Sequence, residues 1–192
     1  MRVKGVFRPQ DYPLAPDAKT RQELDELFAL LCPGQTEPQM PPLKAPWAIM
    51  TAQSPRLPLL LAQVGSHVKD MSWCQRADLR ELSLQAVAFH YRAEFSFHSH
   101  LGVAQTVGLG HDRVAAIPYW RNTTLFDDEQ RLVVEYSLAA AAGEVSDELF
   151  ARVVSRYGER GAIEFTTAVA FWCFWAVINN AMVPVAPAAA TK

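Results

Sequence analysis

Apolar residues recur along most of this chain at the three- and four-residue spacing of an α-helix. Between Asp17 and Leu31 the apolar side chains are three, one and three residues apart, with acidic residues on the opposite face. Between Ala77 and Tyr91 the spacings are three, four and three, and Asp78 is a plausible cap for the first turn. The apolar positions are Leu24, Leu27, Phe28 and Leu31 in the first segment and Leu79, Leu82, Ala86 and Phe89 in the second.

Glycine and proline mark the ends of further helical segments. Ser54-Pro55 opens one of them, and Gly143 and Gly158 close two others. No segment alternates convincingly with the period of two that a strand requires, so we predict an all-α bundle of about eight helical segments. These segments are 17–31, 57–69, 77–91, 93–107, 111–117, 127–142, 146–157 and an apolar terminal helix.

Proline divides the beginning of the chain from the rest. The stretches 8–16 and 33–46 cannot continue a helix because proline lacks the amide donor, so both are predicted to be extended arms or loops. We therefore expect a proline-rich arm with one helix over 1–45, a helical domain over 46–183 and a disordered tail over 184–192. The total of 192 residues suits one domain with an ample core.

Charge and cysteine content argue against several classes of protein, among them nucleic-acid-binding, disulfide-rich and zinc-binding proteins. The chain has 18 basic and 20 acidic side chains, a formal net charge of −2, and so lacks the basic field that nucleic acid or an anionic membrane requires. Its three cysteines are far apart in the sequence and form no C-x-x-C pair, which disfavours a disulfide framework and a cysteine-rich zinc site. No secretion signal follows the basic start, so we expect a cytoplasmic protein.

The end of the chain carries no charge from Phe165 to Thr191, a length that would also span a bilayer. Polar side chains lie in or beside this segment, among them Glu164, Asn179 and Asn180, and no basic cluster follows it. We therefore favour a buried terminal helix in a multi-helix core over a membrane span.

Two polar side chains interrupt the apolar stripe of the segment 93–107. Five residues at spacings of three, four, three and four share one helix face, which is expected to be buried. A buried hydroxyl and imidazole each need a hydrogen-bond partner. A chain reversal near residues 90–91 would bring Glu81 of the preceding helix level with the imidazole. The five residues are Ala93, Ser96, His100, Val103 and Val107.

The same residues resemble a motif of the alkylhydroperoxidase-D-like, or carboxymuconolactone decarboxylase, family of all-α proteins. The peroxidase branch carries a glutamate, eleven residues, a cysteine, two residues, a second cysteine, three residues and a histidine. Here that spacing reads Glu81, Ala93, Ser96 and His100. The segments LRELSLQAVA, YRAEFSFHSHLGVA and FWCFWAVINNAMVP are similar to family helices in the same order, so that the resemblance covers about residues 45–182.

The departures from the motif bear on the chemistry. Ala93 and Ser96 replace the two thiols of the peroxidase branch, which removes its disulfide exchange. Ser96 also stands where lactone-decarboxylase-like members often place an acidic group. What the resemblance keeps is Glu81 and His100, a carboxylate that orients an imidazole for general acid–base catalysis near neutral pH, with Ser96 as a substrate hydrogen-bond donor.

Each of these residues also has a plain structural interpretation. His100 is alternatively a core histidine satisfied by a carboxylate or a backbone carbonyl, and Ser96 a small packing residue. Glu94 and His98 form either a surface pair or further substrate contacts, and Arg92 is either solvated or a partner for a substrate carboxylate. Residues two apart on a helix diverge, so His98 and His100 are not expected to share a metal ion.

Three functions remain open. The first is a cofactor-independent acid–base enzyme acting on a small cyclic or aromatic-derived organic acid or lactone, as a decarboxylase, isomerase or hydrolase. The second is a noncatalytic small-molecule-binding or assembly protein on the same fold. The third, a thiol-dependent peroxidase, is disfavoured by the missing C-x-x-C. The resemblance also implies a homo-oligomer, a trimer or hexamer, and neither metal nor cofactor is expected.

Overall fold

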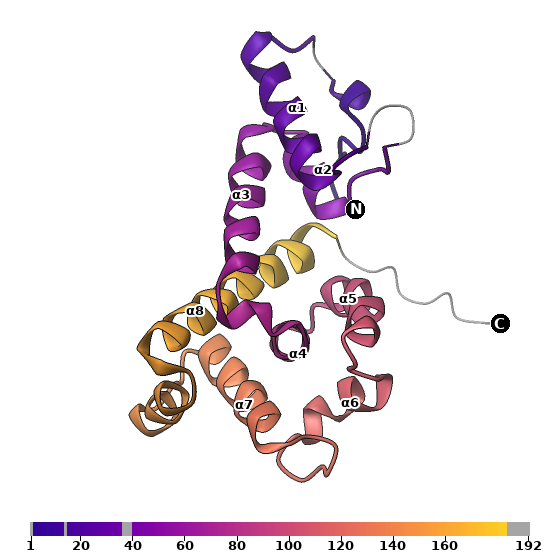
Figure 1. The fold of residues 1–192 in the computed structure, drawn as a ribbon. Coiled ribbons are helices and arrows are strands. Elements are labelled where there is room, and N and C mark those ends of the chain that lie inside the picture. Colours follow the sequence, from indigo (N-terminus) through magenta and orange to yellow (C-terminus); the bar gives the residue numbers. More distant parts are fainter. Residues whose placement is uncertain (1, 14, 36–39, 184–192) are drawn as a thin grey trace, which may run out of the picture. The chain divides into compact units, whose positions relative to one another are not determined.

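The computed structural model describes residues 2–13, 15–35 and 40–183 (Figure 1). Within these ranges all regular structure is helical, with eight α-helices and three short 3-10 helices, which confirms the predicted all-α class. The described chain divides into two compact units. One runs to His67 and takes in Met182 and Val183, and the other runs from Val68 to Ala181. The predicted tail 184–192 lies outside the described residues.

The first unit contains α1 (Ala18–Leu31), α2 (Ala45–Thr51), most of α3 (Arg56–Asp70) and the short helix η1 (Pro9–Asp11). Asp17 caps α1 by accepting a hydrogen bond of 2.7 Å from the Thr20 amide. The N-terminal segment is tied to α2 through the amide of Val6, which donates to the Ala48 carbonyl at 2.8 Å. The core consists of Leu24, Leu27, Phe28, Cys32, Leu43, Ala48, Leu59 and Ala62.

The helix α2 corrects one prediction. The proline-rich stretch 33–46 was expected to be only loop or arm, yet Ala45 and Pro46 are the first two residues of this helix. A proline in the first turn costs no intrahelical hydrogen bond, because the first amide groups of a helix have no acceptor there. The first unit also extends past the predicted boundary at residue 45, because it takes in α2 and most of α3.

The second unit is organised around α4 (Ala77–His90). Every residue from Glu81 to Ala88 is buried, and the helix packs against both α5 (Glu94–Thr106) and α7 (Asp128–Ala142) (Figure 1). A hydrogen bond of 2.9 Å from Ser137 to Ser83 joins α7 to α4 inside the core. A helix enclosed in this way holds its side chains in fixed positions, which matters for its single buried carboxylate, Glu81.

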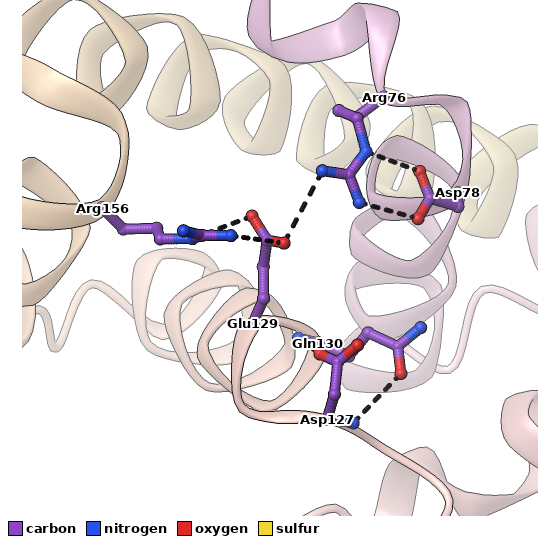
Figure 2. A network of polar contacts seen from close by, with 6 residues as sticks. All are labelled: Arg76, Asp78, Asp127, Glu129, Gln130 and Arg156. Atoms are coloured by element: carbon purple, nitrogen blue, oxygen red, sulfur yellow. Dashed lines mark hydrogen bonds and ion pairs between the residues drawn. The ribbon is translucent and has the colours of Figure 1, made fainter.

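Local signals fix the ends of several helices. Asp127 and Gln130 form a reciprocal cap at the start of α7, with bonds of 2.7 and 3.2 Å (Figure 2). Gly143 closes this helix with a φ of 75°. The expected cap at Asp78 was wrong: Arg76 holds the N-cap position of α4, and Asp78 pairs with it from the first turn.

Three short elements complete the connections of the second unit. The helix η2 (Trp73–Gln75) precedes α4, while α6 (His111–Ala116) and η3 (Ile117–Tyr119) lead from α5 toward α7. Glu164 holds η2 in place, because its Oε2 accepts a buried hydrogen bond of 2.8 Å from the Trp73 amide. Burial alone would raise the pKa of Glu164, but the hydrogen bonds from Trp73 and Arg160 lower it below its ordinary value.

The last helix, α8 (Asp147–Met182), breaks at Gly158, whose φ of 71° and ψ of 169° are not helical. This break matches the predicted end of the segment 146–157. Beyond it, the predicted buried terminal helix is buried on one side, with Phe165 and Val169 enclosed, whereas Ile163, Phe174 and Val177 are exposed by 64%, 36% and 53%. By length and composition α8 is apolar enough to cross a membrane, a weak indication that core helices of soluble proteins share.

Candidate active site

The polar contact at the centre of the candidate site joins α4 to α5. Nδ1 of His100 lies 3.1 Å from Oε1 and 3.2 Å from Oε2 of Glu81. The Glu81 side chain is 3% exposed, whereas the His100 side chain is 32% exposed. The contact predicted from the sequence positions is therefore present, with the carboxylate inside the unit and the ring at its boundary.

A tight reversal between α4 and α5 sets this register. The amide of Ala93 donates to the Ala88 carbonyl at 2.8 Å, and the amide of Arg92 donates to the Phe89 carbonyl at 3.0 Å. This hydrogen-bond pattern closes a helix when the residue at its turn adopts a left-handed conformation, usually glycine. Here Arg92 takes that position with a φ of 50°, the single non-glycine residue with positive φ in the described chain.

The hydrogen bond between Nδ1 of His100 and the Glu81 carboxylate requires one proton between the two groups. An ionised carboxylate only accepts hydrogen bonds, so the ring nitrogen that faces Glu81 must carry the proton when the pair is hydrogen-bonded. Nε2 makes no hydrogen bond to a residue in the described ranges, and the His100 side chain is partly exposed. The arrangement leaves Nε2 free to accept or return a proton.

Ser96 has a partner that the sequence analysis missed. Nδ2 of Asn179, on α8, donates a 2.7 Å hydrogen bond to the Ser96 hydroxyl oxygen. Because that oxygen accepts, the Ser96 hydroxyl proton stays available to another acceptor. The available signal was the polar Asn179 in an otherwise uncharged helix, but nothing in the sequence places it opposite Ser96.

Two buried amide oxygens near the start of α5 have no donor. Asn179 Oδ1 and Gln85 Oε1 are both buried without a hydrogen-bond partner among the described residues. The Gln85 amide itself donates to the Phe97 carbonyl at 3.3 Å, next to Ser96 in the chain. Unsatisfied buried acceptors favour a molecule that brings N–H or O–H groups to this region.

The face of α5 is less buried than expected. Ala93 is fully buried, but Ser96 and His100 are half-buried and Val103 is 39% exposed. Within α5 only Ala104 is fully enclosed. The predicted stripe therefore lies at the edge of the unit, which leaves its two polar side chains partly accessible.

The other three candidate residues do not contact the Glu81–His100 pair. Glu94, His98 and Arg92 are all exposed, and no hydrogen bond or ion pair in the described chain joins them to the Glu81–His100 pair. The His98 ring contacts the Phe97 ring edge-on at a centroid distance of 5.6 Å. Arg92 has an identified backbone role, since it occupies the left-handed position of the α4–α5 turn.

The three cysteines are poorly suited to thiol chemistry. All are free, and burial raises the pKa of each above its ordinary value. The effect is largest at Cys74, which is fully enclosed and whose pKa rises to about 11. A thiol that stays protonated at neutral pH is a weak nucleophile, which disfavours the peroxidase alternative.

The described residues contain no metal-ligand cluster, and the pocket they form lies away from the Glu81–His100 pair. In the described ranges no three His, Cys, Asp or Glu side chains gather as a metal site would require. A pocket of about 440 Å³ lies beside η2 and the break in α8, and its lining includes neither Glu81 nor His100.

Comparison with known proteins gives one short match. Over 82 residues the chain is 33% identical to the uncharacterised protein YnjA of Escherichia coli strain K12, which is 42% of this chain and 44% of that protein. The match thus spans less than half the length of this relative. No family model and no solved structure matches the chain.

Proposed function

We propose that the chain is a cofactor-independent acid–base enzyme of the carboxymuconolactone decarboxylase type, with His100 as its proton-transfer group. The observation that carries this proposal is the 3.1 Å contact between the half-buried ring and the buried Glu81 carboxylate. The substrate is a small cyclic or aromatic-derived organic acid or lactone. The reaction is a decarboxylation, isomerisation or hydrolysis.

The pair would act through Nε2. With Nδ1–H donated to Glu81, Nε2 takes a proton from a carbon next to a carbonyl, and the carboxylate stabilises the imidazolium that forms. The same nitrogen then returns the proton to a different atom of the substrate. No metal or redox step is needed for this sequence.

Ser96 would hold the substrate. Its oxygen accepts from Asn179, so its hydroxyl proton points to a second acceptor, such as the carbonyl or carboxylate oxygen of the substrate. The orphaned oxygens of Gln85 and Asn179 would accept from substrate hydroxyl groups or from water. In this proposal Glu81 and Asn179 are positioning residues, and His100 is the catalytic residue.

The proposal is tested by turnover of a panel of lactones and unsaturated organic acids, with products identified by NMR. We expect His100→Gln and Glu81→Gln each to reduce turnover by at least about 100-fold, as loss of a general acid or base does. Unchanged helical circular dichroism would show that both variants fold. The matched control is His67→Gln, at an exposed histidine of α3.

The alternative is a noncatalytic binding or assembly protein, and the position of the pocket away from His100 favours it. Binding of panel compounds without product would support that function. Wild-type turnover by either variant, on a substrate confirmed for the parent chain, would show that the assigned role of the substituted residue is wrong.

The expected assembly is a cytoplasmic homo-oligomer. The exposed side chains of Ile163, Phe174 and Val177 lie at spacings of eleven and three on α8, and therefore share one helix face. Exposed apolar faces of this kind are typical of surfaces that a partner covers. A second copy of the chain is the partner we propose.

A further inference from the structure

The pocket beside η2 is lined mainly by charged and aromatic side chains from three parts of the second unit. It lies where η2, the first turn of α7 and the segment of α8 around Gly158 meet. Its volume of about 440 Å³ is within the range of small-molecule sites, roughly 300–1,000 Å³. The side chains that carry the argument are Trp73, Arg76, Glu129, Arg156, Tyr157 and Arg160.

The charged side chains of this lining form ion pairs with one another. Three guanidinium groups face two carboxylates, those of Glu129 and Glu164. Glu129 lies between two arginines, at 2.8 Å from Arg156 and 3.6 Å from Arg76 (Figure 2). The hydrogen bond from Arg156 lowers the pKa of Glu129, which favours its ionised form. Arg76 also pairs with Asp78 at 3.1 Å, so three carboxylates balance the three arginines.

Arg160 keeps most of its donors. Its Nε donates to Glu164 Oε1 at 2.9 Å, and its two terminal amino groups have no partner in the described part of the chain. The side chain is 84% exposed, so these four N–H groups are accessible at the mouth of the pocket. A planar guanidinium with both amino groups free matches the two oxygens of a carboxylate or phosphate.

Two neutral donors are buried in the same pocket. The indole N–H of Trp73, which is only 5% exposed, and the hydroxyl of Tyr157 have no acceptor in hydrogen-bond geometry among the described residues. The Tyr157 hydroxyl nevertheless lies close enough to Glu129 and Trp73 to interact with both. Burial, and then the neighbouring Glu129 carboxylate, raise the pKa of Tyr157, so its hydroxyl remains protonated. The unsatisfied groups of this pocket are thus donors, in contrast to the orphaned acceptors near Ser96.

We propose that this pocket is a binding site for a small organic anion, whose carboxylate or phosphate group accepts hydrogen bonds from Arg160 and Trp73. An oxyanion supplies several acceptor oxygens, which complement the free amino groups of Arg160 and the indole N–H of Trp73. The site shares no residue with the Glu81–His100 pair and stands independently of the acid–base proposal.

The experiment follows the Trp73 indole N–H of the full chain by ¹H–¹⁵N NMR, with its resonance assigned from Trp73→Phe. Inorganic phosphate and acetate are titrated separately, and sodium chloride at equal ionic strength is the reference. We expect a saturable shift of this resonance with phosphate, acetate or both. The anion that saturates at the lower concentration identifies the preferred head group.

Two variants make the test specific. Arg160→Gln removes the exposed guanidinium and is expected to weaken anion binding by about tenfold or more, since hydrogen bonds to charged groups are the strong ones. Arg152→Gln is the matched control, because Arg152 also lies on α8 but pairs with Glu135 outside the pocket. A Trp73 resonance that responds to both anions only as it does to chloride would overturn the proposal. Equal anion affinity in Arg160→Gln and the parent chain would overturn it as well.

Discussion

At the scale of single residues, side chains that are equally good site candidates in the sequence have different surroundings in the structure. His100 and His98 are two residues apart, yet one contacts the buried Glu81 and the other is exposed. The contact could be predicted, because helices joined by a tight reversal bring positions equidistant from the turn level with each other. The Asn179–Ser96 bond could not, since it joins residues 83 positions apart across helices whose packing no local pattern records.

The arginine-lined pocket was equally hidden from the sequence. Its donors come from residues 73–76 and 156–160, and the carboxylate between the arginines is Glu129. Each of these side chains, taken alone, is indistinguishable from a solvated surface residue. Only the packing of η2, α7 and α8 brings them to one place.

Cys74 gives a prediction at this scale. Burial raises its pKa from an ordinary value of 9.0 to about 11, so the folded chain keeps this thiol protonated where the unfolded chain would ionise it. The unfolded state then binds fewer protons, and the unfolding free energy falls as pH rises from about 9 to about 11, by roughly 2 kcal/mol. Urea unfolding across this pH range measures the effect. Cys74→Ala should lack this part of the pH dependence, and an identical pH profile in parent and variant would contradict the assignment.

At the scale of elements, capping residues and glycines predicted helix ends correctly where the end depends only on the residues of one turn. Asp127, Gly143 and Gly158 mark helix ends in the sequence and in the structure, because caps and left-handed residues act within one turn. They failed at α2, where Pro46 was taken as a helix breaker although it lies in a first turn. They also gave no sign of the α4–α5 turn, because an arginine holds the position that usually shows glycine.

The strain at Arg92 is testable. A residue with a Cβ in the left-handed conformation costs roughly 1–2 kcal/mol, whereas glycine adopts it freely but loses more entropy on folding. We expect Arg92→Gly to raise the unfolding free energy by up to about 1 kcal/mol and Arg92→Val to lower it. Chemical denaturation of the three chains compares them. If glycine were the least stable of the three, the turn geometry would be wrong.

At the scale of the whole molecule, composition alone does not show what surrounds the apolar surface of α8. A helix that is apolar on every side satisfies the pattern of a core helix, a membrane span and a subunit interface alike. The structure adds that only 33% of its most apolar stretch is buried within the chain. Part of this apolar surface is therefore accessible in a single chain, and self-association is the explanation we propose.

The proposed assembly predicts a mass well above that of one 21.4 kDa chain in light scattering coupled to size exclusion. Ile163→Glu places a charge on the exposed face of α8 and is expected to dissociate the oligomer, because an unpaired charge at an apolar contact is costly. Ser155→Glu, at an exposed position of the same helix, is the control. A monomeric parent chain would exclude self-association, and co-flotation with lipid vesicles would instead favour a membrane contact.

The central claim is that Glu81 fixes the proton of His100 on Nδ1 and leaves Nε2 free for catalysis. Long-range ¹H–¹⁵N correlation spectra of the imidazole, with His100 assigned by substitution, measure this tautomer directly. We predict that the neutral ring carries its proton on Nδ1 in the parent chain and loses this preference in Glu81→Gln. A neutral His100 ring protonated on Nε2 in the parent chain would contradict the account.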